Sequence, residues 1–455
     1  MQQIGARLLG AARRTRWIRS LPILAAVVLA TSTTGLPAAA DDDYRQPGPG
    51  TTVRVSVSSN GEQANAGSER ASVSADGRFA VFTSYATNLV RHDTNGVADV
   101  FVRDLRRHDT SRVSVNSHGE QANGGSAIDP QISPDGRYVV FTSDASNLVP
   151  GDTNGAVDVF RHDLRTGDTI RVSVGPHGAQ GNGPSAKPTV SADGRYVAFT
   201  SYATNLVDGD TNGAWDTFVK DLATGKLVRA SVGSDGTQAN AMSDGPNISA
   251  DGRYAVFISL ASNLVPGDTN NQGDVFAHDL KTGTTTRISV GTAGEQGDDL
   301  SVGATLSGDG HLIGFASHAT TMTANTPTTH DSHAYVREFG TGRTTLVDLS
   351  NGGDVAAGGS FWTAVSGDGR SVAFVSDGAN IVPGDTNAAR DIFVRDLAAG
   401  TTTRISLSSG GAQGDGPSFY PFTNRDAHVV AFQSYATNLV PGDTNGVPDV
   451  FVRYR

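Results

Sequence analysis

The sequence contains no cysteine, and only 18% of its 455 residues are charged. Without cysteine the chain forms no disulfide and offers neither a thiolate metal site nor a cysteine nucleophile. It also lacks the Gly-x-Ser-x-Gly elbow, the His-Glu-x-x-His pair and the phosphate-binding Gly-x-x-x-x-Gly-Lys loop. These absences exclude the usual serine hydrolases, zinc peptidases and nucleotide-binding loops.

Basic residues are also in the minority. The chain has 35 Lys and Arg against 46 Asp and Glu, a net charge of −11, and the first 40 residues hold five of the arginines and no acid. The remainder therefore carries −16. A surface this acidic repels nucleic acid and anionic lipid, so we expect no nucleic-acid partner. Cations and neutral sugars or peptides are more natural ligands.

Residues 1–40 have the pattern of an export signal. The basic stretch ARLLGAARRTRWIRS precedes the apolar run LPILAAVVLAT at 21–31, which is short for a membrane span, and Ala38–Ala40 offers a cleavage site. An uncleaved anchor is the alternative. We predict a signal peptide at 1–40, a disordered linker at 41–50, and a secreted, extracellular protein with no membrane span after signal removal.

The rest of the chain repeats itself. Aromatic residues recur every 58 or 59 positions in two columns, which predicts a repeat architecture. The first column is Phe82, Phe141, Phe199, Phe257, Phe315, Phe374 and Phe432. The second is Phe101, Phe160, Phe218, Phe276, Tyr335, Phe393 and Phe451. Seven copies of this unit fill residues 51–455.

Each copy reads as four short strands. In the third copy they are AKPTVSA, RYVAFTS, WDTFVKDL and LVRASV, joined by a tight DG turn, a long loop and an ATGK turn. We therefore predict an all-β, seven-bladed β-propeller of four-stranded antiparallel blades over 51–455. The chain stops after the third strand of the last copy, while 51–65 matches a fourth strand and linker. The N-terminal strand should thus complete the seventh blade.

The strand motifs SADGRYVAFTS and DVFVRDL resemble the repeat of TolB-like propellers, which are related to WD-type repeats. The resemblance covers 51–455. It departs from TolB in lacking an additional N-terminal α/β domain and in having a longer loop between second and third strands. Proteins with this repeat range from periplasmic scaffolds to propeller partners of peptidases, so the resemblance implies a fold and no single activity.

The long loops and the blade-to-blade linkers should share one face, which we take as the candidate functional face. Six loops there contain an Asp-x-Asn-x-x-x-Asp motif. Its members are Asp93, Asn95, Asp99, Asp152, Asn154, Asp158, Asp210, Asn212, Asp216, Asp268, Asn270, Asp274, Asp385, Asn387, Asp391, Asp443, Asn445 and Asp449. The oxygens resemble half of a calcium loop, which makes calcium the candidate cofactor. The alternative is structural, because Asp and Asn-Gly also close turns.

A catalytic site should break the sevenfold repeat. The fifth copy has lost the loop motif and carries His311, His318, His330 and His333. His330, Asp331 and His333 could bind a transition metal or supply a general base, or could belong to a degenerate loop. Trp215 and Trp362 are two further exceptions, able to stack on sugars or peptides or to fill gaps between blades.

The sequence thus favours a non-catalytic propeller that binds an extracellular protein, peptide or glycan. An extracellular hydrolase or lyase using blade five is one alternative. A calcium-stabilised structural propeller is the other.

Overall fold

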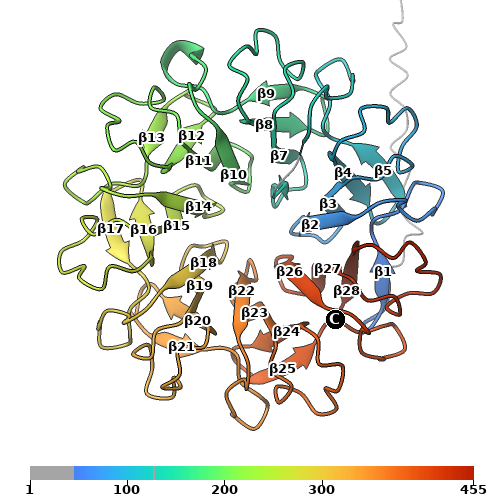
Figure 1. Cartoon of the computed structure of the whole chain (residues 1–455), viewed down its shortest axis with the longest axis vertical. Coiled ribbons are helices and arrows are strands. Elements are labelled where there is room, and N and C mark those ends of the chain that lie inside the picture. The colour runs from blue at the N-terminus through green and yellow to red at the C-terminus, as the bar shows by residue number, and fades with distance from the viewer. Residues whose placement is uncertain (1–45, 127–128) are drawn as a thin grey trace, which may run out of the picture. The chain divides into compact units, whose positions relative to one another are not determined.

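Seven four-stranded antiparallel sheets surround a common axis in the computed structural model, which describes residues 46–126 and 129–455 (Figure 1). The predicted seven-bladed propeller is therefore confirmed. The predicted signal peptide at 1–40 and the first half of the predicted linker lie outside the described residues. The end of that linker is described, and the Gly50 N–H donates to the Tyr454 carbonyl at 2.7 Å.

The first strand of each blade lies nearest the axis (Figure 1). These inner strands are β2 (Ser68–Val73), β6 (Gln131–Ile132), β10 (Ser185–Val190), β14 (Ser243–Ile248), β18 (Ser301–Leu306), β22 (Ser360–Val365) and β26 (Ser418–Thr423). The second strands are β3 (Phe79–Ser84), β7 (Tyr138–Ser143), β11 (Tyr196–Ser201), β15 (Tyr254–Ser259), β19 (Leu312–Ser317), β23 (Ser371–Ser376) and β27 (Val429–Ser434).

The third and fourth strands lie progressively further out. The third strands are β4 (Asp99–Asp104), β8 (Asp158–Asp163), β12 (Asp216–Asp221), β16 (Asp274–Asp279), β20 (His333–Glu338), β24 (Asp391–Asp396) and β28 (Asp449–Tyr454). The outer strands are β5 (Asp109–Arg112), β9 (Thr169–Arg171), β13 (Leu227–Arg229), β17 (Thr284–Arg287), β21 (Thr344–Leu346), β25 (Thr401–Arg404) and β1 (Thr52–Arg54). We number the blades one to seven from the blade of β2 to the blade of β26.

The two aromatic columns meet inside each blade. Phe82 of β3 lies directly opposite Phe101 of β4, and both rings are fully buried. The corresponding pair stacks in every blade, with centroids 5.6 to 6.1 Å apart. Burying one such side chain contributes roughly 1.5–3 kcal/mol, so these pairs are a main source of each blade's stability.

Strand β1 closes the ring by pairing with β28, the last strand of the chain (Figure 1). Val53 lies opposite Val452, and the Arg453 guanidinium donates to the Thr52 hydroxyl at 2.8 Å. The predicted completion of blade seven by the N-terminal strand is confirmed. Closure leaves each blade flanked by two neighbours, which protects the sheet edges from pairing with other chains.

Helix is almost absent from this part of the chain. Among the described residues the one helical element is a 3₁₀ turn, η1 (Pro176–Gly178). Accordingly, no helix within 46–126 and 129–455 has the length and apolar character needed to cross a membrane.

Candidate functional site

The Asp-x-Asn-x-x-x-Asp loops are closed by an arginine that the sequence interpretation overlooked. In blade one, Arg112 at the end of β5 lies 3.5 Å from a carboxylate oxygen of Asp93 and 3.6 Å from one of Asp99. All three side chains are buried. The guanidinium thus occupies the space between the two carboxylates that a cation would otherwise fill.

Amide and hydroxyl groups complete the network. Asn95 donates to Asp99 and to the Ala122 carbonyl, both at 3.1 Å, and Gln121 donates to Asp93 at 2.9 Å and to Asp99 at 3.2 Å. The Ser114 hydroxyl donates to the other oxygen of Asp99 at 2.5 Å. Loop, outer strand and linker are therefore joined through one buried carboxylate.

The arginine between two buried aspartates recurs in six blades. The arginines are Arg54, Arg112, Arg171, Arg229, Arg287 and Arg404, each within 4.0 Å of both aspartates of its blade. Burial raises the pKa of Asp99, and it does so for Asp216 and Asp274 as well. A buried carboxylate needs a counter-charge, and arginine supplies it. This geometry favours loop closure over calcium, which requires six to eight oxygen ligands.

In blade five the whole network is replaced together. Leu346 stands opposite Tyr335 where Arg112 stands opposite Phe101 in blade one, and His333 begins β20 where Asp99 begins β4. His333 Nδ1 lies 2.8 Å from an Asp348 carboxylate oxygen, and both side chains are buried. Burial raises the pKa of Asp348. A compact buried His–Asp pair thus joins the first residue of β20 to the segment that follows β21.

The histidines of blade five do not converge. His330 is exposed and pairs with Asp299 at 2.8 Å, while His318 Nδ1 contacts the His330 carbonyl at 2.8 Å. Asp331 is exposed, and His311 lies at the other end of β19. Over 46–126 and 129–455, no three His, Asp or Glu side chains are grouped to hold a metal ion.

Six of the seven inner strands carry a second repeated feature, a β-bulge; the exception is β6. In β2, Arg70 and Ala71 together face the single residue Phe82 of β3, and Arg70 has φ 57°. The corresponding residues also have positive φ, and they differ in chemistry from blade to blade. They are Arg70, Asp129, Lys187, Gly245, Gly303, Trp362 and Tyr420. We call them the bulge ring.

Only two members of the bulge ring are glycine, the residue that adopts positive φ without strain. Trp362 at φ 42° and Tyr420 at φ 52° are bulky residues in a conformation that costs of order 1–3 kcal/mol. Bulges of this kind often re-aim side chains beside binding sites. The side chains at these positions are therefore the variable element of an otherwise uniform scaffold.

Aromatic side chains gather around Trp362 and Tyr420. Their ring centroids are 4.8 Å apart, and Phe361 and Phe419 lie 6.1 and 6.3 Å from the Trp362 ring. Tyr435 packs in turn on Phe419, at 6.1 Å. Trp362 is 38% exposed and Tyr435 50%. We call these five residues the aromatic cluster; it joins blades six and seven at the end of the inner strands nearest the long loops.

Ion pairs lie beside the aromatic cluster and continue from it around the ring of blades. The Arg70 guanidinium lies 4.1 Å from the centre of the Tyr420 ring and forms an ion pair with Asp129 at 2.6 Å. Arg390 lies over Phe361 and pairs with Asp377 at 2.8 Å, and Lys187 pairs with Asp244. Donors and acceptors thus stand side by side along the same rim.

Of the residues singled out from sequence, the structure brings only Trp362 into this cluster. Trp215 lies in blade three and packs against Tyr202 at 5.8 Å. Tyr435 and the members of the bulge ring other than Trp362 were missed. The signal for the bulge ring was one position that varies among arginine, aspartate, lysine, glycine, tryptophan and tyrosine while its neighbours repeat.

No family model matches the chain, and no curated protein matches it. Several solved structures are similar to the chain. An oligogalacturonate lyase from Vibrio parahaemolyticus is 14% identical, covering 89% of this chain and 93% of the lyase, with a TM-score of 0.53. The β-propeller domain of the Trilobed protease from Pyrococcus furiosus is 11% identical, covering 85% and 95%, with a TM-score of 0.52.

TolB from Acinetobacter baumannii is also similar, at 15% identity over 74% of this chain and 63% of TolB, with a TM-score of 0.40. At such identities, the likeness to the lyase and to the protease domain extends to the propeller fold and no further. Function has to be argued from the residues of this chain.

Proposed function

We propose that the protein is a secreted, non-catalytic binding propeller that holds an extracellular glycan on the aromatic cluster, at the long-loop end of its central channel. The observation that carries the proposal is the backbone strain at Trp362 and Tyr420. Glycine at this position would remove the strain, as in blades four and five. Retaining two large, partly exposed rings there makes sense if the rings contact a ligand.

A neutral glycan suits this surface better than a peptide or a polyanion. Sugar rings present flat C–H faces that pack against aromatic rings, and their hydroxyl groups both donate and accept hydrogen bonds. The Arg70–Asp129 and Arg390–Asp377 pairs offer donors and acceptors together, with their charges already balanced. The acidic chain as a whole disfavours strongly anionic polymers.

Within the described residues, the histidines of blade five do not form the arrangement that the hydrolase or lyase alternative needs. His333 is buried against Asp348, His330 is held by Asp299, and the two do not share a site. Loops in which a guanidinium lies between the two carboxylates do not favour calcium.

The test is a glycan array, with a peptide array beside it, followed by calorimetry on any glycan that binds. Trp362→Gly and Tyr420→Gly should each weaken that binding roughly tenfold or more, because each removes one stacking surface. Tyr202→Ala is the matched control. Tyr202 follows β11 as Tyr435 follows β27 and is similarly exposed, at 45%, but lies outside the aromatic cluster.

Binding of a glycan that survives both glycine substitutions would refute the site. A protein that binds peptides and no glycan would refute the ligand class.

A further inference from the structure

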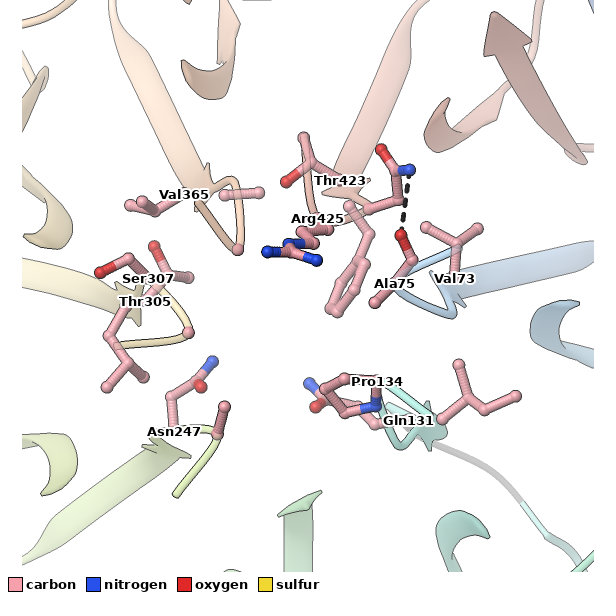
Figure 2. A pocket seen from close by; sticks show the side chains of 18 of the residues that line it. Val73, Ala75, Gln131, Pro134, Asn247, Thr305, Ser307, Val365, Thr423 and Arg425 are labelled. Atoms are coloured by element: carbon pink, nitrogen blue, oxygen red, sulfur yellow. Dashed lines mark hydrogen bonds between the residues drawn. The ribbon is translucent and has the colours of Figure 1, made fainter. Parts of the chain in front are cut away.

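The opposite end of the channel holds a cavity of about 340 Å³. It lies where the inner strands end and the tight turns to the second strands begin (Figure 2). Its apolar wall includes Val73, Ile132, Ile248, Val365 and Phe422. A mostly apolar concavity of this size, near the lower end of the usual range, suits a small molecule.

A closed ring of backbone hydrogen bonds holds the rim of this cavity. In each blade a backbone N–H of the tight turn donates to a carbonyl in the tight turn of the next blade. The donor is the N–H of the ring residue itself or of the residue after it, and the turn of blade seven donates to that of blade one. The residues are Ala75, Pro134, Ala192, Ala250, Gly308, Gly367 and Arg425, joined by seven bonds of 2.7 to 3.4 Å. We call them the turn ring. Because every turn is tied to its neighbours, the cavity is largely preformed.

Arg425 breaks the symmetry of the turn ring. The other six members are alanine, glycine or proline, whereas blade seven places the largest basic side chain at the same point. Its N–H donates to Ala75 at 3.3 Å and its carbonyl accepts from Asp368 at 2.7 Å, so the backbone is fixed on both sides. Figure 2 shows the guanidinium projecting from its turn into the space that the other turns surround.

Arg425 is the one charged residue among those that line the cavity. No ion pair joins it to another side chain in the described part of the protein. The polar groups nearby are neutral and include Gln131, Asn247 and Thr423, whose buried hydroxyl has no hydrogen-bond partner. Arg425 is exposed, so its guanidinium stands on the solvent side of an otherwise uncharged cavity, where an anion entering from solvent can reach it.

We propose that this cavity binds a small organic carboxylate, with Arg425 as the carboxylate receptor and the apolar wall around the organic body. A single guanidinium matches a carboxylate through two parallel hydrogen bonds and balances its one charge, whereas it would leave a phosphate dianion with an uncompensated negative charge. Aspartates of the neighbouring turns, such as Asp76 and Asp135, bond within their own turns at the mouth. Their charge selects against polyanions.

The carboxylate has two possible sources, a free organic acid or the C-terminus of a short apolar peptide. Benzoate is the first probe, measured by calorimetry on the full chain, and a tripeptide ending in phenylalanine is the second. Benzyl alcohol, the amidated tripeptide and inorganic phosphate are the ligand controls. Benzoate should bind with a Kd on the order of millimolar or tighter, and the controls should not bind.

Arg425→Ala is the decisive variant, because alanine already occupies this place in blades one, three and four. It should weaken benzoate binding roughly tenfold or more while the unfolding midpoint stays unchanged. Trp362→Gly should leave benzoate binding intact, which separates this site from the proposed glycan site. Free-acid tripeptide binding stronger than that of benzoate would identify a peptide terminus as the source.

Three outcomes would overturn the proposal. They are no binding of either carboxylate probe by the wild type, equal binding of benzoate by Arg425→Ala, or phosphate binding as strong as that of benzoate.

Discussion

The indole of Trp362 and the phenol ring of Tyr420 contact each other across the boundary between blades six and seven, with ring centroids 4.8 Å apart. Both residues sit in a bulge where the backbone is left-handed. This left-handed backbone conformation costs free energy, and it also brings two side chains from separate blades into one surface. The contact is thus formed by two residues at equivalent strained positions of neighbouring blades, and no inserted loop is needed.

This strain predicts an unusual mutational outcome. Replacing either ring by glycine should leave the urea midpoint unchanged or slightly raised, because relief of the left-handed backbone, of order 1–3 kcal/mol, offsets the lost contacts. Phe432→Ala, in the buried core of blade seven, is the comparison and should cost about 3–5 kcal/mol. A large loss at Trp362 or Tyr420 would mean that the rings are mainly structural.

The loop network predicts a strong dependence on its arginine. Arg112→Leu leaves Asp93 and Asp99 buried without their counter-charge, and should lower the free energy of unfolding by about 3–5 kcal/mol. Arg107→Leu, at an exposed position in the same blade, should change it by less than about 0.5 kcal/mol. Urea unfolding followed by circular dichroism measures both.

The same geometry predicts that calcium has no stabilising effect. The unfolding midpoint of the wild type should be equal in millimolar calcium and in chelator, because the guanidinium of Arg112 already lies between the carboxylates. A midpoint several degrees higher in calcium would instead revive the calcium-stabilised structural propeller.

An ion pair on the tight-turn face predicts a specific pH dependence. Hydrogen bonds from Arg137 hold the pKa of Asp163 at about 2, below the value near 3.9 expected in the unfolded chain. The pair therefore stabilises the fold above about pH 4, and that contribution is lost as the pH falls toward 2. The difference in unfolding free energy between wild type and Arg137→Gln should be present at pH 6 and vanish near pH 2.

Blade six supplies the control for that experiment. Arg370 occupies the place of Arg137 but is 82% exposed and reaches only Asp368, at 4.0 Å. Arg370→Gln should show no such pH-dependent difference. Equal behaviour of the two variants would rule out the ion pair as the cause.

Ring closure predicts that β1 can act in trans. Deleting residues 1–58 removes β1 and the partner of Asp449, Arg54, so the shortened protein should unfold at lower temperature and self-associate through the exposed edge of β28. Adding a peptide of residues 50–66 should restore the midpoint, whereas the same peptide with proline at Val53 should not. Size-exclusion chromatography and thermal unfolding report both effects.

The sequence was sufficient to predict the fold because the repeat is strictly kept at the positions that pack in the core of each blade. Phe82 and Phe101 stand 19 residues apart in the chain, yet their recurrence in seven copies marked both as core. The Arg112 column was readable too, since Arg disappears in blade five together with the aspartates. It was overlooked because it lies on a different strand from the loop that it closes.

The binding surfaces were harder to foresee, for a physical reason. A bulge adds a residue and reverses the alternation of side chains, so the direction of Tyr420 does not follow from the strand period. Arg425 lies in a turn whose sequence departs from the other copies at several positions. Its approach to the axis depends on how seven turns assemble, and no single repeat contains that information.

The seam between β1 and β28 also orders events during synthesis. Strand β1 is translated before any of the inner strands and remains without its partner until β28 has been made. Earlier blades can collapse on their own buried aromatic pairs, but the circle cannot lock before the final strand appears. A product that ends before β28 therefore keeps two unpaired sheet edges, and synthesis of β28 is the step that pairs them.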